Sequence, residues 1–202
     1  MTSSATESPT RMRSEDRREQ VIRAAMGVFG ERGYVGATTD AVAKAAGVSQ
    51  PYVVRMFGSK ETLFLSVLEH ALDGLLTAFR AVLADAGEAS GDDLHHRLGQ
   101  AYGELLSDRG LLLSLMHGFV SGNDPAIGAR ARAGFLEVYR LLRRDAGFGA
   151  EEARDFLAQG MLLNTLVGLK MGLEDADPDA RELLECIAPT KADLLVRLAQ
   201  PS

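Results

Sequence analysis

The residues between 38 and 60 combine hydroxyl, amide, phenol and cationic groups at a spacing that suits contacts with nucleic acid. They stand at or beside the starts of three successive helical segments: Thr38, Thr39, Ser49, Gln50, Pro51, Tyr52, Arg55 and Lys60. A glutamine amide can pair with the edge of adenine, and a tyrosine can contact a thymine methyl group or a phosphate. A cation beside the free N–H groups of a helix start favours phosphate. We therefore take these residues as the candidate DNA-binding site.

Two short helices joined by a tight turn must position these side chains. The first begins after the capping residue Thr38 and ends at Gly47. The second begins after Ser49 and ends before Gly58. This is the layout of a helix-turn-helix, in which the N-terminal residues of the second helix enter the major groove. On spacing alone, a generic helical hairpin is an equal alternative.

Helical periodicity extends over the rest of the chain, and no segment alternates apolar and polar residues with a period of two. We expect an all-α fold with about nine or ten helices. The longer helices are predicted over 14–32, 60–85, 125–146, 150–173 and 178–199, the last interrupted at Pro189. The predicted organisation is a disordered tail over 1–13, a helix-turn-helix domain over 14–59, a connecting helix over 60–85 and a ligand-binding and dimerisation domain over 86–202.

Charge is divided unevenly along the 202 residues, which carry a formal net charge of −6. Residues 11–60 hold nine basic and five acidic side chains, whereas the remainder holds 13 basic and 23 acidic ones. A basic N-terminal segment on an acidic body indicates one polyanion-binding module and a second domain with another role.

Cellular location is predicted from cysteine usage and apolar runs. The single cysteine, Cys186, allows no internal disulfide and fits a reducing compartment. No apolar run approaches the roughly 20 residues of a membrane span, and the first residues lack the order of a signal peptide. We expect a cytoplasmic protein without a membrane partner.

Catalytic and metal-binding motifs are not found. The sequence contains no nucleophile elbow, P-loop or glycine-rich dinucleotide fingerprint. His95 and His96 are adjacent, so on a helix they point apart, which is poor geometry for a metal site. The prediction is a protein that is not an enzyme and has no metal or cofactor.

The segment from Arg17 to Leu68 resembles the DNA-binding region of the TetR family of one-component bacterial repressors. The matching residues are Val21-Ile22-Arg23-Ala24-Ala25, Phe29, Gly33-Tyr34, Thr38-Thr39, Val42-Ala43, Ala46-Gly47-Val48-Ser49, Phe57, Ser59-Lys60-Glu61 and Leu63-Phe64. The family usually has leucine-tyrosine where this chain has Val53-Val54, and that tyrosine often contacts the DNA backbone. Tyr52 and Arg55 are the two candidates to supply this contact here.

The resemblance implies a helical homodimer in which a variable C-terminal domain binds a small molecule that releases DNA. It implies a ligand-responsive regulator, a repressor released from a palindromic operator by an effector. The C-terminal domain offers apolar and aromatic residues with scattered polar groups that could line the effector pocket: Phe79, Tyr102, Leu112, Met116, His117, Phe119, Phe135, Tyr139, Met161 and Asn164. The resemblance places the dimer interface on the last two long helices, where the candidate residues are Phe156, Leu163, Val167, Met171, Leu183, Leu184 and Ile187.

Two other functions remain open. The chain could be a helical small-molecule-binding or protein-interaction module without sequence-specific DNA binding, its helix-turn-helix packing only against a protein. It could also be an all-α enzyme with a buried cavity, although no acid–base pair in the sequence supports that alternative.

Overall fold

The computed structural model describes residues 14–87, 91–105, 108–171 and 177–187, and every regular element in these ranges is a helix. The elements are α1 (Ser14–Gly36), α2 (Thr39–Ala45), α3 (Gln50–Phe57), α4 (Lys60–Asp85), α5 (Asp92–Leu105), α6 (Arg109–Val120), α7 (Pro125–Arg140), the π-helical turn η1 (Leu141–Asp145), α8 (Ala150–Gly168) and α9 (Pro178–Ile187). The predicted all-α fold is confirmed. The tail predicted over 1–13 and the segment beyond Pro189 lie outside the described residues.

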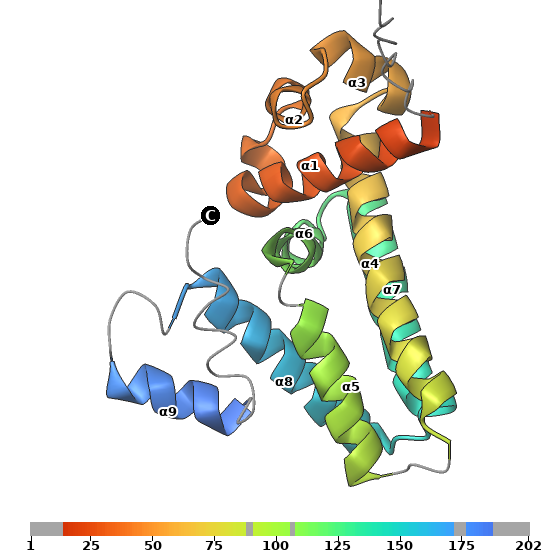
Figure 1. Cartoon of the computed structure of the whole chain (residues 1–202), viewed down its shortest axis with the longest axis vertical. Coiled ribbons are helices and arrows are strands. Elements are labelled where there is room, and N and C mark those ends of the chain that lie inside the picture. The colour runs from red at the N-terminus through yellow and green to blue at the C-terminus, as the bar shows by residue number, and fades with distance from the viewer. Residues whose placement is uncertain (1–13, 88–90, 106–107, 172–176, 188–202) are drawn as a thin grey trace, which may run out of the picture.

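The first three helices form one end of the molecule, and α4 leads away from them beside α7 (Figure 1). The helix α1 is kinked at Gly33, where a φ of 68° and a ψ of 172° suit glycine. This kink falls next to the predicted end of the helix at residue 32. The extra turn to Gly36 redirects the chain toward α2.

Local capping explains where α2 and α3 begin. The side chain of Thr38 accepts a hydrogen bond from the backbone N–H of Ala41, and Ser49 holds an extended conformation before α3. Gly47, at a φ of 65°, makes the turn between the two helices. Val53 and Phe57 then bury one face of α3, which packs against α2 and α4. The opposite face of α3 is left exposed.

Helix α4 connects the two ends of the molecule. Its residues Phe64, Leu68 and Leu72 are almost fully buried, and the Phe64 ring meets the Phe29 ring of α1 edge to face at 4.9 Å. By length and apolar composition α4 alone among the described helices could cross a membrane, although half of its most apolar stretch is buried inside the protein. Packing against α1, α5, α6 and α7 accounts for these apolar side chains.

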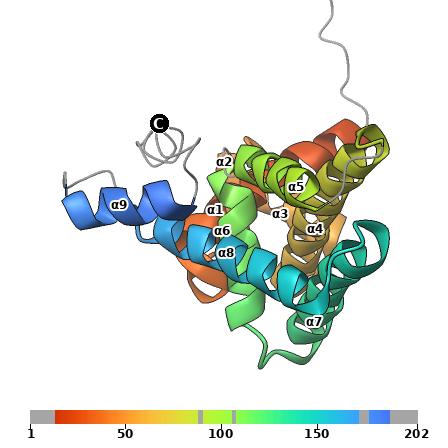
Figure 2. The same ribbon diagram turned by 90° about the horizontal axis from the view of Figure 1, so that it is seen from below.

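Helix α6 lies between α1 and the lower helices α5 and α8, as the views in Figures 1 and 2 show. Small residues bring α1 and α6 together, since a Cβ atom on Gly110 would lie 3.2 Å from the backbone nitrogen of Gly27. The hydroxyl of Ser114, which is fully buried, donates to the carbonyl of Met26 at 3.4 Å. The backbones of α1 and α6 are thus in direct contact.

The last helices differ in detail from the prediction. The helix expected over 125–146 consists of α7 followed by η1, and α8 ends at Gly168 rather than near residue 173. Helix α9 lies outside the main helical body (Figures 1 and 2). These differences arise at helix ends, where periodicity carries the least information.

Candidate nucleic-acid interface and ligand cavity

The outer face of α3 carries the candidate DNA-binding residues. Gln50, Pro51, Val54 and Arg55 are exposed there, while Tyr52 is half-buried at the flank. Positions 50 and 54, and likewise 51 and 55, are one helical turn apart and so share a face. Val54 stands where the family usually has a tyrosine, and it cannot supply the hydrogen bond of that residue. Its exposure of 38% adds an apolar group suited to contact with a thymine methyl.

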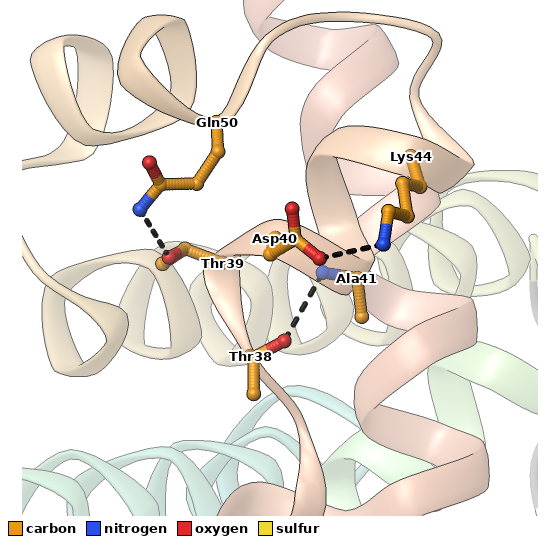
Figure 3. A network of polar contacts seen from close by, with 6 residues as sticks. All are labelled: Thr38, Thr39, Asp40, Ala41, Lys44 and Gln50. Atoms are coloured by element: carbon orange, nitrogen blue, oxygen red, sulfur yellow. Dashed lines mark hydrogen bonds and ion pairs between the residues drawn. The ribbon is translucent and has the colours of Figure 1, made fainter.

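Hydrogen bonds from α2 position the first residue of this face. The Gln50 amide nitrogen donates to the Thr39 hydroxyl at 3.3 Å, and the amide oxygen points away from Thr39 (Figure 3). Beside them, Lys44 pairs with Asp40 at 2.9 Å within α2. Thr38 is occupied as the cap of α2. The two threonines therefore support the site, and Gln50 presents its amide outward.

Tyr52 and Arg55 contact each other beside this face of α3. The guanidinium of Arg55 lies 5.2 Å from the centre of the Tyr52 ring, an attractive cation–π arrangement. The hydroxyl of Ser49 makes no capping hydrogen bond, which leaves it available to an outside partner. Because Arg55 is exposed and held over the ring, it is the better placed of the two candidates for a phosphate.

The structure corrects the role given to Lys60. Its ammonium group donates to three backbone carbonyls, those of Tyr34 at 3.0 Å, Ala37 at 3.3 Å and Val35 at 3.4 Å. It also lies 4.7 Å from the centre of the Tyr34 ring. The group therefore holds the junction between α1 and α2 together and does not face a phosphate. The group at the start of α4 that could still bind a phosphate is the N-terminus of the helix, which is capped by Ser59.

Replacing Lys60 with methionine tests this correction. We expect the variant to lose about 1 kcal/mol of folding stability, because the junction carbonyls lose their shared donor. The salt dependence of DNA binding should stay as in the wild type, because no phosphate contact is removed. The measurements are thermal unfolding and DNA titrations at several salt concentrations. Lys44→Met is the matched control; a flatter salt slope for Lys60→Met alone would restore the phosphate role.

A cavity of about 50 Å³ lies between α4, α5, α6, α7 and α8. Six of the residues proposed from the sequence line it: Phe79, Tyr102, Phe119, Phe135, Met161 and Asn164. The wall also contains Phe156, which was expected at the dimer interface, and six residues for which no role was predicted: Leu72, Leu75, Leu115, Val138, Leu157 and Gly160. Helical periodicity marked both groups as apolar, but it could not show which of them surround a space.

Four proposed pocket residues lie elsewhere, which corrects that part of the prediction. Leu112 is fully buried in the core, and Met116 and Tyr139 are partly buried away from the cavity wall. His117 lies against α1, with its Nε2 atom 3.4 Å from the carbonyl of Gly30. A Cβ on Gly33, the kink residue of α1, would lie 3.3 Å from the His117 ring. His117 therefore belongs to the contact between α6 and α1.

One polar pair interrupts the apolar wall of the cavity. The Tyr102 hydroxyl donates to the side-chain oxygen of Asn164 at 2.6 Å, and both residues are buried. Burial raises the pKa of Tyr102 to about 12, although the hydrogen bond with Asn164 acts in the opposite direction. The phenol is therefore neutral at physiological pH, and the cavity wall carries no ionised side chain.

A wider groove of about 490 Å³ adjoins this cavity. Phe119, Phe135 and Met161 line both spaces, and the two phenylalanine rings meet edge to face at 5.7 Å. The groove is also lined by Arg132, the one charged residue on its wall among the described residues. No metal-binding cluster of His, Cys, Asp or Glu occurs in the described part of the chain.

The proposed dimer residues do not share an outer surface. Phe156, Leu163 and Val167 are buried within this chain, so they stabilise its own core, and Met171 is partly buried against that core. Leu183 is exposed at 37%, and the side chains of Leu184 and Ile187 lie outside the described residues. The outer face of α8 instead presents Leu162 and Leu169, exposed at 40% and 65%. The apolar side chains of α8 are thus divided between residues buried inside this chain and residues exposed on its outer face.

Comparison with known proteins agrees with this arrangement. The sequence model of the family described as bacterial regulatory proteins, tetR family, matches residues 21–67. The chain is 29% identical over 177 residues to the HTH-type transcriptional activator FasR of Mycolicibacterium smegmatis, which covers 83% of this chain and 77% of FasR.

Solved structures show the same fold over most of the chain. A TetR family member from Streptomyces coelicolor A3 aligns with a TM-score of 0.61 and 24% identity, covering 92% of this chain and 99% of the other. The multidrug binding protein EbrR in complex with malachite green aligns with a TM-score of 0.55 and 26% identity, covering 92% of this chain and 99% of EbrR. Residues 21–67 therefore carry the DNA-binding region of the tetR family of bacterial regulatory proteins, and the chain as a whole has the fold of solved TetR-family structures.

Proposed function

We propose that the chain acts as a homodimer that binds a palindromic operator and leaves it when a small molecule fills the cavity. The exposed face of α3 carries this proposal, because its polar side chains have no packing role in the fold. In a two-fold dimer the two α3 helices would enter major grooves one turn apart, about 34–36 Å. The outer apolar face of α8 is the proposed surface between the copies.

Two helices link the cavity to the DNA-binding end. Helix α6 carries Leu115 and Phe119 on the cavity wall, and Ser114 against the backbone of α1. Helix α4 carries Phe79 on the wall and Phe64 in the core of the first three helices. A ligand that binds more tightly to one arrangement of these helices would increase the population of that arrangement. The difference in affinity sets the size of this shift, and the spacing of the α3 pair would change with it.

Repression is the proposed sign of regulation, since a bound dimer needs only to occupy DNA in order to block a promoter. Activation is the second candidate, because the relative FasR, which aligns with most of the chain, is named an activator. Transcription in vitro from a promoter that contains the operator separates them. The protein acts in either case where the DNA is, in the bacterial cytoplasm.

The proposal is tested by titrating the protein into fluorescent duplexes from the DNA that flanks its own gene. We expect saturable binding of two chains per duplex, weakened by salt and by an unlabelled copy of the same duplex. Adding a metabolite extract should release the DNA. A protein-interaction module would bind no duplex at low salt, and that result would remove the proposal.

A further inference from the structure

We infer that the effector is an amphiphile with an apolar body and one anionic end group. The body would occupy the cavity, which shares Phe119, Phe135 and Met161 with the groove, and the anion would stay in the groove at Arg132. The release of DNA by this ligand rests on the proposed function. The binding itself does not, because it is measured without DNA.

The cavity excludes charge from its interior. Its wall is apolar except for Tyr102 and Asn164, which are neutral and bonded to one another. An ion moved there would lose its hydration without meeting an opposite charge, which is a large penalty. The pair still offers a hydroxyl and an amide to a neutral polar atom on the ligand. The part of the ligand that enters the cavity is therefore uncharged.

The groove in front of the cavity carries an uncompensated cation. Arg132 and Arg130 are both on α7, but only Arg130 is paired with carboxylates, at 3.5 Å from Glu69 and 3.4 Å from Glu137. Arg132 has no ion pair among the described residues. A guanidinium donates two parallel hydrogen bonds to a carboxylate or phosphate, so an anionic group is its natural ligand.

The absence of a side chain on Gly128 lets the backbone of Gly122 and the Arg132 guanidinium approach α7 closely. A Cβ atom on Gly128 would lie 3.0 Å from the Arg132 Nη1 atom and would collide with the carbonyl oxygen of Gly122. Both glycines line the groove. Since the groove shares Phe119, Phe135 and Met161 with the cavity, the two spaces lie side by side, and one ligand would span them where these side chains turn aside.

The anionic ligand that we infer for this chain has the opposite charge to ligands bound by one structural relative. EbrR has been solved with malachite green and with ethidium, both of which are cations. Aromatic side chains attract cations through their ring faces, so a cationic ligand is the main alternative to an anionic one for this cavity. The free charge at Arg132 favours the opposite sign.

The test is calorimetric titration of the full chain, without DNA, with probes that differ only at one end: decanoate, decan-1-ol and decylammonium. We expect one decanoate per chain, bound at least tenfold more tightly than decylammonium. Hexanoate should bind at least tenfold more weakly than decanoate, because less apolar surface enters the cavity. Tighter binding of decylammonium, or no saturable decanoate site, would overturn the inference.

Arg132→Gln isolates the anion contact. We expect this exposed substitution to weaken decanoate binding about tenfold and to leave decan-1-ol binding unchanged, while Arg132→Lys retains most of the preference. Arg140→Gln, an exposed arginine on the same helix but outside the groove, is the matched control. Equal decanoate affinity of Arg132→Gln and wild type would contradict the role of Arg132. Decanoate binding without DNA release would contradict only the regulatory consequence.

Discussion

Replacing Gln50 with alanine is expected to change which DNA sequence the protein prefers. The Gln50 amide stands at the exposed start of α3 and is held there by the Thr39 hydroxyl. If the amide pairs with an adenine edge, its loss removes about 1–3 kcal/mol of discrimination at one base pair in each half-site. Because both copies in the dimer lose the amide, the affinity for the best operator should fall by about 2–6 kcal/mol, roughly 30- to 20,000-fold, while the affinity for operators altered at that base pair changes little.

The measurement is a selection of duplexes from a random pool, followed by titration of the wild type and Gln50→Ala on single-base variants. Arg55→Ala, which removes the proposed phosphate contact on the same helix, is the comparison, because losing a phosphate contact would weaken all sequences alike. If Gln50→Ala shows the same sequence preference as the wild type, then Gln50 does not contact a base.

Replacing Gly110 with valine is expected to separate α6 from α1. A Cβ atom there already lies 3.2 Å from backbone atoms of Gly27 and Met26, and a larger side chain has nowhere to go without moving a helix. Overpacking of this kind costs about 1–3 kcal/mol of folding stability. For a chain of this length each kcal/mol lowers the Tm by roughly 2–4 °C.

The same substitution should weaken communication between the cavity and α3. Compounds that release the wild type from DNA should bind the variant with similar affinity but release less DNA. Gly99→Val is the matched control, since a Cβ atom on Gly99 of α5 meets nothing within 4 Å. An unchanged Tm and an unchanged DNA release in Gly110→Val would show that the α1–α6 contact neither supports the fold nor transmits the signal.

Features that depend on neighbouring residues could be predicted from the sequence. Thr38 caps the N–H group of a residue three positions later, and Gly47 turns the chain between two adjacent helices. Such signals are complete within a few residues, so the helices and the helix-turn-helix follow from them. The exposed start of α3 follows as well, because Val53 and Phe57 on the other face are apolar.

Features that depend on distant residues could not be predicted in this way. Lys60 is bound by carbonyls more than 20 residues earlier, so its direction depends on how α1 meets α4. Phe156 and Leu163 are apolar at helical spacing, but spacing does not show whether the partner is the same chain or a second copy. His117 likewise contacts α1, 87 residues away in sequence.

A methylation-protection footprint on the selected operator tests the DNA-binding account most directly, because it reports which groove is covered. Insertion of α3 into the major groove predicts protection of major-groove atoms in two patches related by the two-fold axis of the operator and separated by one helical turn. It also predicts that Gln50→Ala loses protection at one base pair in each patch. Protection confined to the minor groove, or an unchanged pattern in a variant with the α3 face removed, would contradict it.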